Sequence, residues 1–301
     1  MSLQKQFIQY VKKNQFWEPK SNVCIAVSGG IDSMVLMHLM HRTQRFHQAQ
    51  LEVCTIDHQL RRESLKECSL VVEEANKIGL RTHHHKICIE RGGNLYERAR
   101  TARQRVLLSL GCDRIATGHH QQDQAETVLY RLLRGSGIQG LSGMRPLSIP
   151  WCRPLLFASK QQIQDFAKKE GLRWLDDPSN SKSLRGSLRE IFPILDAIHG
   201  PSVPAIARTA QSLANDAELL EAYTQEAWKR SHIEGHLCRK IWEKERKGMQ
   251  FRLLKELFVF HGIPIRYNII ASFVAYPSKI QLPKGGWIEL DEEKIWIVPK
   301  E

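Results

Sequence analysis

The sequence of 301 residues has no long apolar run, no paired cysteines and comparatively few acidic residues. No segment approaches the ~18 consecutive apolar residues that a membrane-spanning helix needs. The N-terminal stretch is amphipathic and contains lysines, but it lacks the apolar core of a signal peptide. We therefore expect a soluble protein without a membrane partner.

Seven cysteines are scattered along the chain, and no two of them form a C-x-x-C pair. An odd, scattered set argues against a disulfide framework and against a cysteine-bound metal or iron–sulfur cluster. The pattern favours a reducing compartment, so we expect a cytoplasmic protein.

Acidic residues are scarce only in the first part of the chain. The net charge is +12, with 44 Lys and Arg against 32 Asp and Glu. Residues 1–215 hold 30 basic and 19 acidic side chains, whereas residues 216–301 hold 14 and 13. Nucleic acid is the simplest partner for such a basic region, although a solvated basic surface explains the charge alone equally well.

Short apolar runs alternate with helix-like patterns as far as residue 135. Strands are expected at 22–27, 51–57, 81–89 and 113–118, and helices at 31–43, 62–80, 94–111 and 122–135. This alternation predicts right-handed crossovers and a parallel, doubly wound sheet covered on both faces. The expected fold class is α/β.

The alternation stops near residue 150, and helical patterns follow, the longest over 204–230. The last run, KIQLPKGGWIELDEEKIWIVP, alternates apolar and polar residues around turn residues, which predicts short antiparallel strands. We expect a catalytic domain with a helical extension over 1–215. A small α+β domain, with its linker helix, is expected over 216–301.

The segment CIAVSGGIDSMVLMHLM (24–40) places Ser28, Gly29 and Gly30 between a strand and a helix. Glycines let backbone amides approach an oxyanion, and the helix N-terminus adds a favourable partial charge. A plain capped turn would explain a glycine pair alone. Neither the Walker A pattern nor G-x-G-x-x-G fits. The full S-G-G-x-D-S pattern resembles the pyrophosphate-binding loop of the N-type ATP pyrophosphatases.

That resemblance implies cleavage of ATP between the α and β phosphates, with the adenylate transferred to the substrate. It assigns pyrophosphate binding to Ser28, Gly29, Gly30, Ile31, Asp32 and Ser33. The adenine is expected over the strand edge near residues 25–27 and 55–57. A Mg²⁺ ion is also implied, with Asp32 as its expected carboxylate ligand.

A second group of polar residues lies in ATGHHQQDQAETVLYRLLRGSGIQGLSGM (116–144). Asp123 and Glu126 are three residues apart at a helix start, so they share one helix face. His119 and His120 precede them at the same carboxyl edge of the sheet. Packing explains any one of these residues alone, but the four together predict a functional site.

With its neighbours, this stretch resembles the tRNA(Ile)-lysidine synthase family. TIDHQLR (55–61), NLYERARTARQRVLL (94–108), RPLL (153–156) and LDDPSN (175–180) follow in the family's order. The first of these implies that Asp57 and His58 contribute to the nucleotide site. Two positions depart from the family pattern: Gln122 replaces a first aspartate and Gly186 replaces an asparagine.

The family resemblance implies a two-step reaction on a CAU-anticodon isoleucine tRNA. Carbon-2 of the wobble cytidine is adenylated with ATP, and free L-lysine then displaces AMP to give lysidine. Asp123 and Glu126 are expected to hold the lysine. One carboxylate or His119 would accept the proton that the lysine ammonium must lose before it attacks.

Arginines are expected to contact the remaining phosphates. Arg103 or Arg100 would balance the adenylate, and Arg189 would reach the α-phosphate or the tRNA backbone. Arg61 and Arg185 are expected beside the anticodon loop. Residues 216–301 would then recognise the shape of the tRNA, and the family suggests a homodimer.

Three other functions remain open. tRNA 2-thiolation shares the loop but usually relies on paired cysteines. Ammonia-using synthesis of NAD or GMP would not need the basic excess or the histidine–carboxylate helix. A non-catalytic RNA-binding module is disfavoured by the intact loop together with Asp123 and Glu126.

Overall fold

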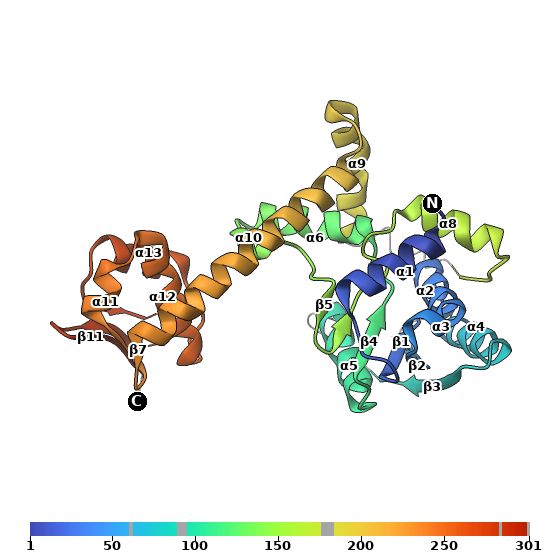
Figure 1. The fold of residues 1–301 in the computed structure, drawn as a ribbon, viewed down its shortest axis with the longest axis horizontal. Helices are drawn as coiled ribbons and strands as arrows, with labels where there is room; N and C mark the ends of the chain where they lie inside the picture. Colours follow the sequence, from blue (N-terminus) through green and yellow to red (C-terminus); the bar gives the residue numbers. More distant parts are fainter. Residues whose placement is uncertain (60–62, 89–94, 176–183, 283–284, 300–301) are drawn as a thin grey trace. The chain divides into compact units, whose positions relative to one another are not determined.

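The computed structural model describes residues 1–59, 63–88, 95–175, 184–282 and 285–299. The chain divides into two units, Met1–Ala214 and Asn215–Glu301 (Figure 1). The 30-residue helix α10 (Ser202–Ser231) crosses the boundary between them. Among the described residues, no helix combines the length and the apolar character that crossing a membrane requires.

A six-stranded sheet organises the first unit, in the order β3-β2-β1-β4-β6-β5. The parallel strands are β1 (Asn22–Ala26), β2 (Gln50–Asp57), β3 (Arg81–Lys86), β4 (Arg114–Thr117) and β6 (Trp151–Cys152). β5 (Leu147–Ser148) pairs antiparallel with β6. The predicted parallel α/β sheet is confirmed. The sequence patterns missed β5 and β6, because two residues are too few to show a period.

Each of the first four strands leads into a helix. These helices are α2 (Ile31–Arg42), α4 (Glu63–Lys77), α5 (Leu95–Ser109) and α6 (Gln121–Leu133). β1 lies between β2 and β4, so the crossovers leave it in opposite directions along the sheet. Such a switch point opens a crevice at the carboxyl ends of the two central strands. The loop after β1 and the loop after β4 therefore meet there.

Helix α2 is apolar nearly all the way round and is buried on most sides. It contacts β1 and β2 on the sheet side and α8 (Lys160–Lys169) on the other, and α1 (Leu3–Asn14) and α3 (Gln44–His47) complete this layer. The side chains from Met34 to Met37 are fully buried. A helix that is hydrophobic all round belongs inside a protein, so the start of α2 is a rigid platform.

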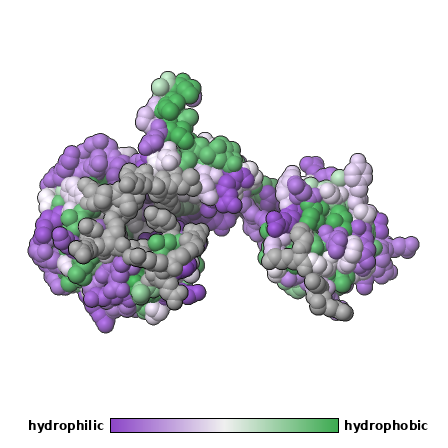
Figure 2. All heavy atoms as spheres, turned by 180° about the vertical axis from the view of Figure 1, so that it is seen from behind, coloured by the Kyte–Doolittle hydropathy of each residue, from purple (hydrophilic) through white to green (hydrophobic). Residues whose placement is uncertain are grey.

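Two further helices of the first unit contact α6. The short helix α7 (Ile138–Leu141) is folded back onto α6, where Gln124 bonds the backbone of residues 142–144. Helix α9 (Leu184–His199) contacts α6 and exposes Ile194 and Ile198. Figure 2 shows hydrophobic residues gathered on α9. An apolar surface of this kind is typical of a contact site.

The second unit has its own sheet and its own core. Its antiparallel strands are β7 (His232–Ile233), β8 (His236–Cys238), β9 (Ile280–Gln281), β10 (Trp287–Leu290) and β11 (Lys294–Val298). Its helices are α11 (Arg239–Lys244), α12 (Lys247–Phe260) and α13 (Tyr267–Ala275). Trp242, Phe258 and Phe273 are buried in the core between them. The predicted small α+β unit with antiparallel strands is confirmed.

Candidate active site

The loop between β1 and α2 is closed by two serines. Ser33 Oγ donates to the carbonyl of Gly30 at 2.9 Å and accepts from the Ser28 amide at 3.1 Å. Gly30 occupies the N-cap of α2 without a side chain to cap it. The first-turn amides of a helix have no intrahelical acceptor. The loop is thus preformed to receive an anion at the positive end of α2.

Gly29 is required for two independent reasons. Its φ of +86° lies in the region that favours glycine, and an added Cβ would lie 3.1 Å from Glu67 Cβ and 3.2 Å from the Glu67 carbonyl. Its own carbonyl accepts from the Leu175 amide at 3.0 Å. The loop is therefore held on one side by α4 and on the other by the segment that ends at Leu175.

Gly118 brings the end of β4 directly against the start of α2. A Cβ at Gly118 would lie 3.0 Å from the Asp32 carbonyl carbon and 3.0 Å from the Ser33 amide nitrogen. Both neighbours are backbone atoms, so neither can swing aside. Gly118 therefore brings the loop after β4 into direct contact with the loop after β1.

His120 stands between two carboxylates at the N-cap of α6. Its Nδ1 accepts from the Gln122 amide at 3.2 Å, so a neutral ring carries its proton on Nε2. That Nε2 lies 3.6 Å from Asp32 Oδ1 and 3.5 Å from Asp123 Oδ2. The ring is only 3% exposed. His120, rather than the neighbouring His119, is therefore the histidine that faces both carboxylates.

The two carboxylates of α6 have different surroundings. Asp123 Oδ2 accepts from the His120 amide at 2.9 Å in a capping box. Glu126 is 1% exposed, and its Oε1 accepts from Arg189 Nε of α9 at 2.6 Å. Burial would lower the pKa of Arg189, but Glu126, Asp123 and Asp32 outweigh it and raise that pKa. Arg189 therefore pairs with Glu126 and also feels the negative charges of Asp123 and Asp32.

Asp32 has a basic partner that the sequence patterns did not single out. Lys160 Nζ, in the first turn of α8, lies 2.7 Å from Asp32 Oδ1 and 2.9 Å from Oδ2. Both side chains are about one third exposed, at 34% for Lys160 and 30% for Asp32. The pair lies 128 residues apart in sequence, so no local motif could reveal it.

A carboxylate at the end of β2 shapes the next loop. Asp57 Oδ1 accepts from Ser64 Oγ at 2.5 Å and from the Gln59 amide at 2.8 Å. Burial raises the pKa of Asp57, but these hydrogen bonds outweigh it and the pKa is lowered. His58, which follows Asp57, is half-buried. Asp57 thus holds the turn beside the expected nucleotide site.

Most of the strand edge expected to hold the adenine, residues 25–27 and 55–57, is buried. Ile25, Val27 and Thr55 are buried, and the Val27 amide already donates to the carbonyl of Cys54 at 2.9 Å. Residues 58 and 59, just beyond the end of β2, remain as the accessible edge. Arg61 and the LDDPSN residues from 176 onward lie outside the described residues, as does the side chain of Arg185.

Arginines gather at the carboxyl end of β6. Arg153 follows β6 directly and donates to the Arg145 carbonyl at 2.7 Å, and its Nε finds no acceptor within the described parts of the chain. Burial lowers the pKa of Arg153, and the charges of Arg100 and Arg131 lower it further. Arg100 and Arg103 are themselves exposed on α5. This basic corner suits a phosphate group.

Thr117 orients His119 beside this corner. Thr117 Oγ1 donates to the Cys152 carbonyl at 3.3 Å and lies 2.8 Å from His119 Nδ1. In the tautomer whose proton is on Nδ1, that nitrogen donates to Thr117 Oγ1. The neutral ring then keeps Nε2 as the nitrogen that can accept a proton.

The described residues hold no group of three or more His, Cys, Asp or Glu side chains that could bind a metal alone. Mg²⁺ usually takes one or two carboxylates and completes its shell with water and substrate phosphates. Asp32 and Asp123 face one imidazole nitrogen next to the anion-binding loop. Asp32, the carboxylate that belongs to the loop, fits a Mg²⁺ ion that arrives with a phosphate substrate.

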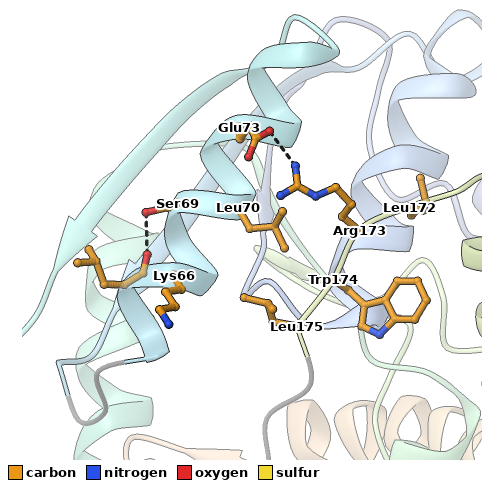
Figure 3. Close-up of a pocket in the computed structure, with 9 residues that line it drawn as sticks. Lys66, Ser69, Leu70, Glu73, Leu172, Arg173, Trp174 and Leu175 are labelled. Atoms are coloured by element: carbon orange, nitrogen blue, oxygen red, sulfur yellow. Dashed lines mark hydrogen bonds and ion pairs between the residues drawn. The ribbon is translucent and has the colours of Figure 1, made fainter.

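A groove of about 690 Å³ adjoins the loop from outside (Figure 3). Helix α4 supplies one wall, with Leu70, and residues 172–175 supply the other. Arg173 and Glu73 form a 2.7 Å ion pair at its margin. The groove is separate from the carboxylates and connects with the loop through the bond from Leu175 to Gly29. Its lining is mostly apolar, with Lys66, Ser69, Glu73 and Arg173 as its polar members.

Comparison with known proteins assigns the same region to one family. A family model described as a PP-loop domain matches residues 1–195. The chain is 35% identical over 214 residues to a tRNA(Ile)-lysidine synthase of Azoarcus sp. (strain BH72), covering 67% of this chain and 48% of that protein. It is also 35% identical to a tRNA(Ile)-lysidine synthase of Novosphingobium aromaticivorans, covering 71% and 68%.

The chain spans about half the length of the curated relatives it matches, such as the Azoarcus protein. Among solved structures it resembles the U34-tRNA thiolase NcsA of Methanococcus maripaludis. The TM-score is 0.57 at 19% identity, and the match covers 69% of this chain and 78% of that one. At this identity the likeness concerns the fold alone.

Proposed function

Because this chain belongs to the PP-loop domain family and, within it, to the tRNA(Ile)-lysidine synthases, we propose that it makes lysidine. L-Lysine would be joined to carbon-2 of the wobble cytidine of a CAU-anticodon isoleucine tRNA, which changes the codon read from AUG to AUA. The observation that carries this proposal is the position of His120 between Asp32 of the loop and Asp123 of α6. A phosphate site and an amine site then share one crevice.

Adenylation is assigned to the loop side of the crevice. The first-turn amides of α2 bind the pyrophosphate, and the closed conformation of Ser28 and Ser33 presents them without rearrangement. Mg²⁺, held by Asp32 and phosphate oxygens, would neutralise the charge that develops on pyrophosphate as it leaves. Arg100 or Arg103 would balance the charge of the adenylate, and Arg153, whose charge interacts with that of Arg100, would contribute to the same basic corner.

Lysine attack is assigned to the α6 side. A free amine is protonated near pKa 10.4, so it must lose a proton before it attacks. Asp123 is the carboxylate that can hold the ammonium, because Glu126 is buried against Arg189. His119, whose Nε2 can accept a proton, is the proposed base.

The remaining partners follow from the same reaction. tRNA, ATP and free lysine are all available in the cytoplasm, where we expect the enzyme to act. The exposed Ile194 and Ile198 of α9 offer a surface on which two copies of the chain would associate as a homodimer. Sedimentation of the wild type against Ile194→Lys tests this, and a monomeric wild type would contradict it.

The proposed function is tested by transfer of radiolabelled lysine to tRNA. We expect ATP-dependent labelling of isoleucine tRNA with a CAU anticodon, and lysidine in the digested nucleosides. The same tRNA with a GAU anticodon is the matched control and should remain unlabelled. Equal labelling of both, or none of either while ATP is hydrolysed, would contradict the assignment.

A further inference from the structure

The ion pair between Lys160 and Asp32 blocks the position where a metal would bind. Lys160 Nζ contacts both carboxylate oxygens, at 2.7 Å and 2.9 Å. Mg²⁺ binds a carboxylate oxygen at 2.0–2.1 Å with near-octahedral geometry. An ammonium that covers both oxygens leaves too little room for such an ion. Either the metal or Lys160 can hold Asp32, but not both in this arrangement.

The backbone that carries Lys160 is fixed, so only its side chain can move. Ser159 and Gln162 form a capping box at the start of α8. The Gln121 amide of α6 donates to the Ala158 carbonyl at 3.0 Å, which ties α8 to α6. Lys160 itself is 34% exposed and ends a flexible four-carbon stem. The ammonium can therefore swing from Asp32 without any change in the fold.

Breaking the ion pair between Lys160 and Asp32 costs little free energy, and the displaced ammonium remains close to the phosphate-binding loop. Ion pairs that are this exposed contribute little to stability. An ammonium displaced from Asp32 stays beside the start of α2, where the loop amides would hold pyrophosphate. A second cation there would share the negative charge of the phosphates with the metal.

We propose that Lys160 is a switchable counterion of the pyrophosphate site. It neutralises Asp32 when the site is empty, and it moves onto the phosphate oxygens when a nucleotide brings Mg²⁺ to Asp32. The inference rests on the proposed use of ATP at this loop, but not on the identity of the RNA or of the amine. The ion pair also explains how the negative charge of Asp32 is balanced in the free protein, where Asp123 is close by.

Two titrations of the full chain test the proposal. Mn²⁺ serves as a paramagnetic stand-in for Mg²⁺, and its binding is followed by electron paramagnetic resonance without nucleotide. Lys160→Met should bind Mn²⁺ several-fold more tightly than the wild type, because Asp32 is vacated. The magnesium complex of pyrophosphate, followed by calorimetry, should bind Lys160→Met about tenfold more weakly, the loss of one charge-assisted hydrogen bond.

Matched variants separate this switch from a general effect of charge. Lys168→Met removes an exposed lysine from the same helix and should change neither titration. Lys160→Arg keeps the charge and should restore most of the pyrophosphate affinity. An ion pair with a purely structural role would leave both affinities of Lys160→Met unchanged, and that result overturns the proposal. So does a shift of both affinities in the same direction.

Neither titration contains tRNA or lysine, so a failed lysidine assay would leave the proposal intact. Conversely, lysidine formation with unaltered titrations in Lys160→Met would remove the switch and keep the function. Circular dichroism and the melting temperature, unchanged in Lys160→Met, show that the variant is folded.

Discussion

The three carboxylates of the crevice differ in their surroundings, and we expect their roles to differ for that reason. Asp32 is partly exposed and paired with a lysine, Asp123 is held by a helix cap, and Glu126 is buried against an arginine. Sequence reasoning treated Asp123 and Glu126 as an equivalent pair on one helix face. The structure gives them different neighbours, and different consequences follow from replacing each.

Asp123→Asn should weaken the use of lysine more than the binding of ATP, because the ammonium loses its charged partner. Glu126→Gln should instead destabilise the first unit by roughly 3 kcal/mol, because it leaves the buried end of the ion pair with Arg189 incomplete. AMP release at varied lysine concentration, with urea unfolding of each variant, measures both effects. If Asp123→Asn abolishes ATP binding and leaves lysine saturation unchanged, Asp123 is a metal ligand rather than an amine site.

Asp57 should make the first unit sensitive to acid. Its pKa is lowered in the folded state, so its contribution to stability is complete above the unfolded pKa of about 3.9. That contribution is lost as the pH falls through the lower, folded value. Asp57→Asn should therefore reduce stability near pH 7 and flatten its decline in acid. Urea midpoints between pH 7 and pH 2.5 measure this, and identical slopes for both proteins would show that Asp57 is not the group responsible.

Some site residues were predictable from the sequence and others were not, for a physical reason. Ser28 to Ser33 form a contiguous loop whose glycine spacing is visible in the chain. Lys160 and Arg153 act through partners that only the folded sheet brings near, so local spacing carried no indication of them. His119 and His120 have different partners, Thr117 for the first and the two carboxylates for the second, and the spacing of adjacent residues cannot show which ring takes which.

At the scale of elements, the site depends on two backbones in direct contact. The end of β4 touches the first turn of α2 through Gly118, and α6 is tied to α8 through the bond from Gln121 to Ala158. Alternating patterns predicted the four longer strands and the helices after them. They missed β6, whose two residues extend the sheet and lead directly into Arg153.

Gly118→Ala should disable adenylation without unfolding the protein. The added Cβ would lie 3.0 Å from backbone atoms of Asp32 and Ser33, so the start of α2 must shift. Overpacking of this kind typically costs about 1–3 kcal/mol. A displacement near 1 Å at reacting groups is expected to slow AMP formation about 100-fold. The rate of AMP formation in the presence of tRNA is the measurement.

Gly137→Ala is the matched control for that variant. Gly137 has an ordinary φ of −77° and nothing within 4 Å of an added Cβ. It should retain the wild-type rate. Equal, unimpaired rates in both variants would show that the contact between β4 and α2 does not set the geometry of the loop.

At the scale of the whole molecule, the charge is concentrated in residues 1–215, which hold 30 basic and 19 acidic side chains. We expect tRNA binding to weaken steeply with salt, because each phosphate contact releases counterions. Arg100→Ala should flatten the log–log slope by roughly one if Arg100 contacts a phosphate. Deleting residues 216–301 should weaken tRNA binding and leave ATP binding intact. A salt-independent affinity would contradict a phosphate interface.

The most direct test is a single-turnover chase with isoleucine tRNA that bears a CAU anticodon. The enzyme is mixed with tRNA and α-labelled ATP, and the label on tRNA is followed before and after lysine is added. We expect label on the tRNA before lysine is added, and its release as AMP, with lysidine formed in equal amount, once lysine is present. Release of AMP without tRNA, or at a rate that lysine does not change, would contradict a shared crevice for adenylation and amine attack.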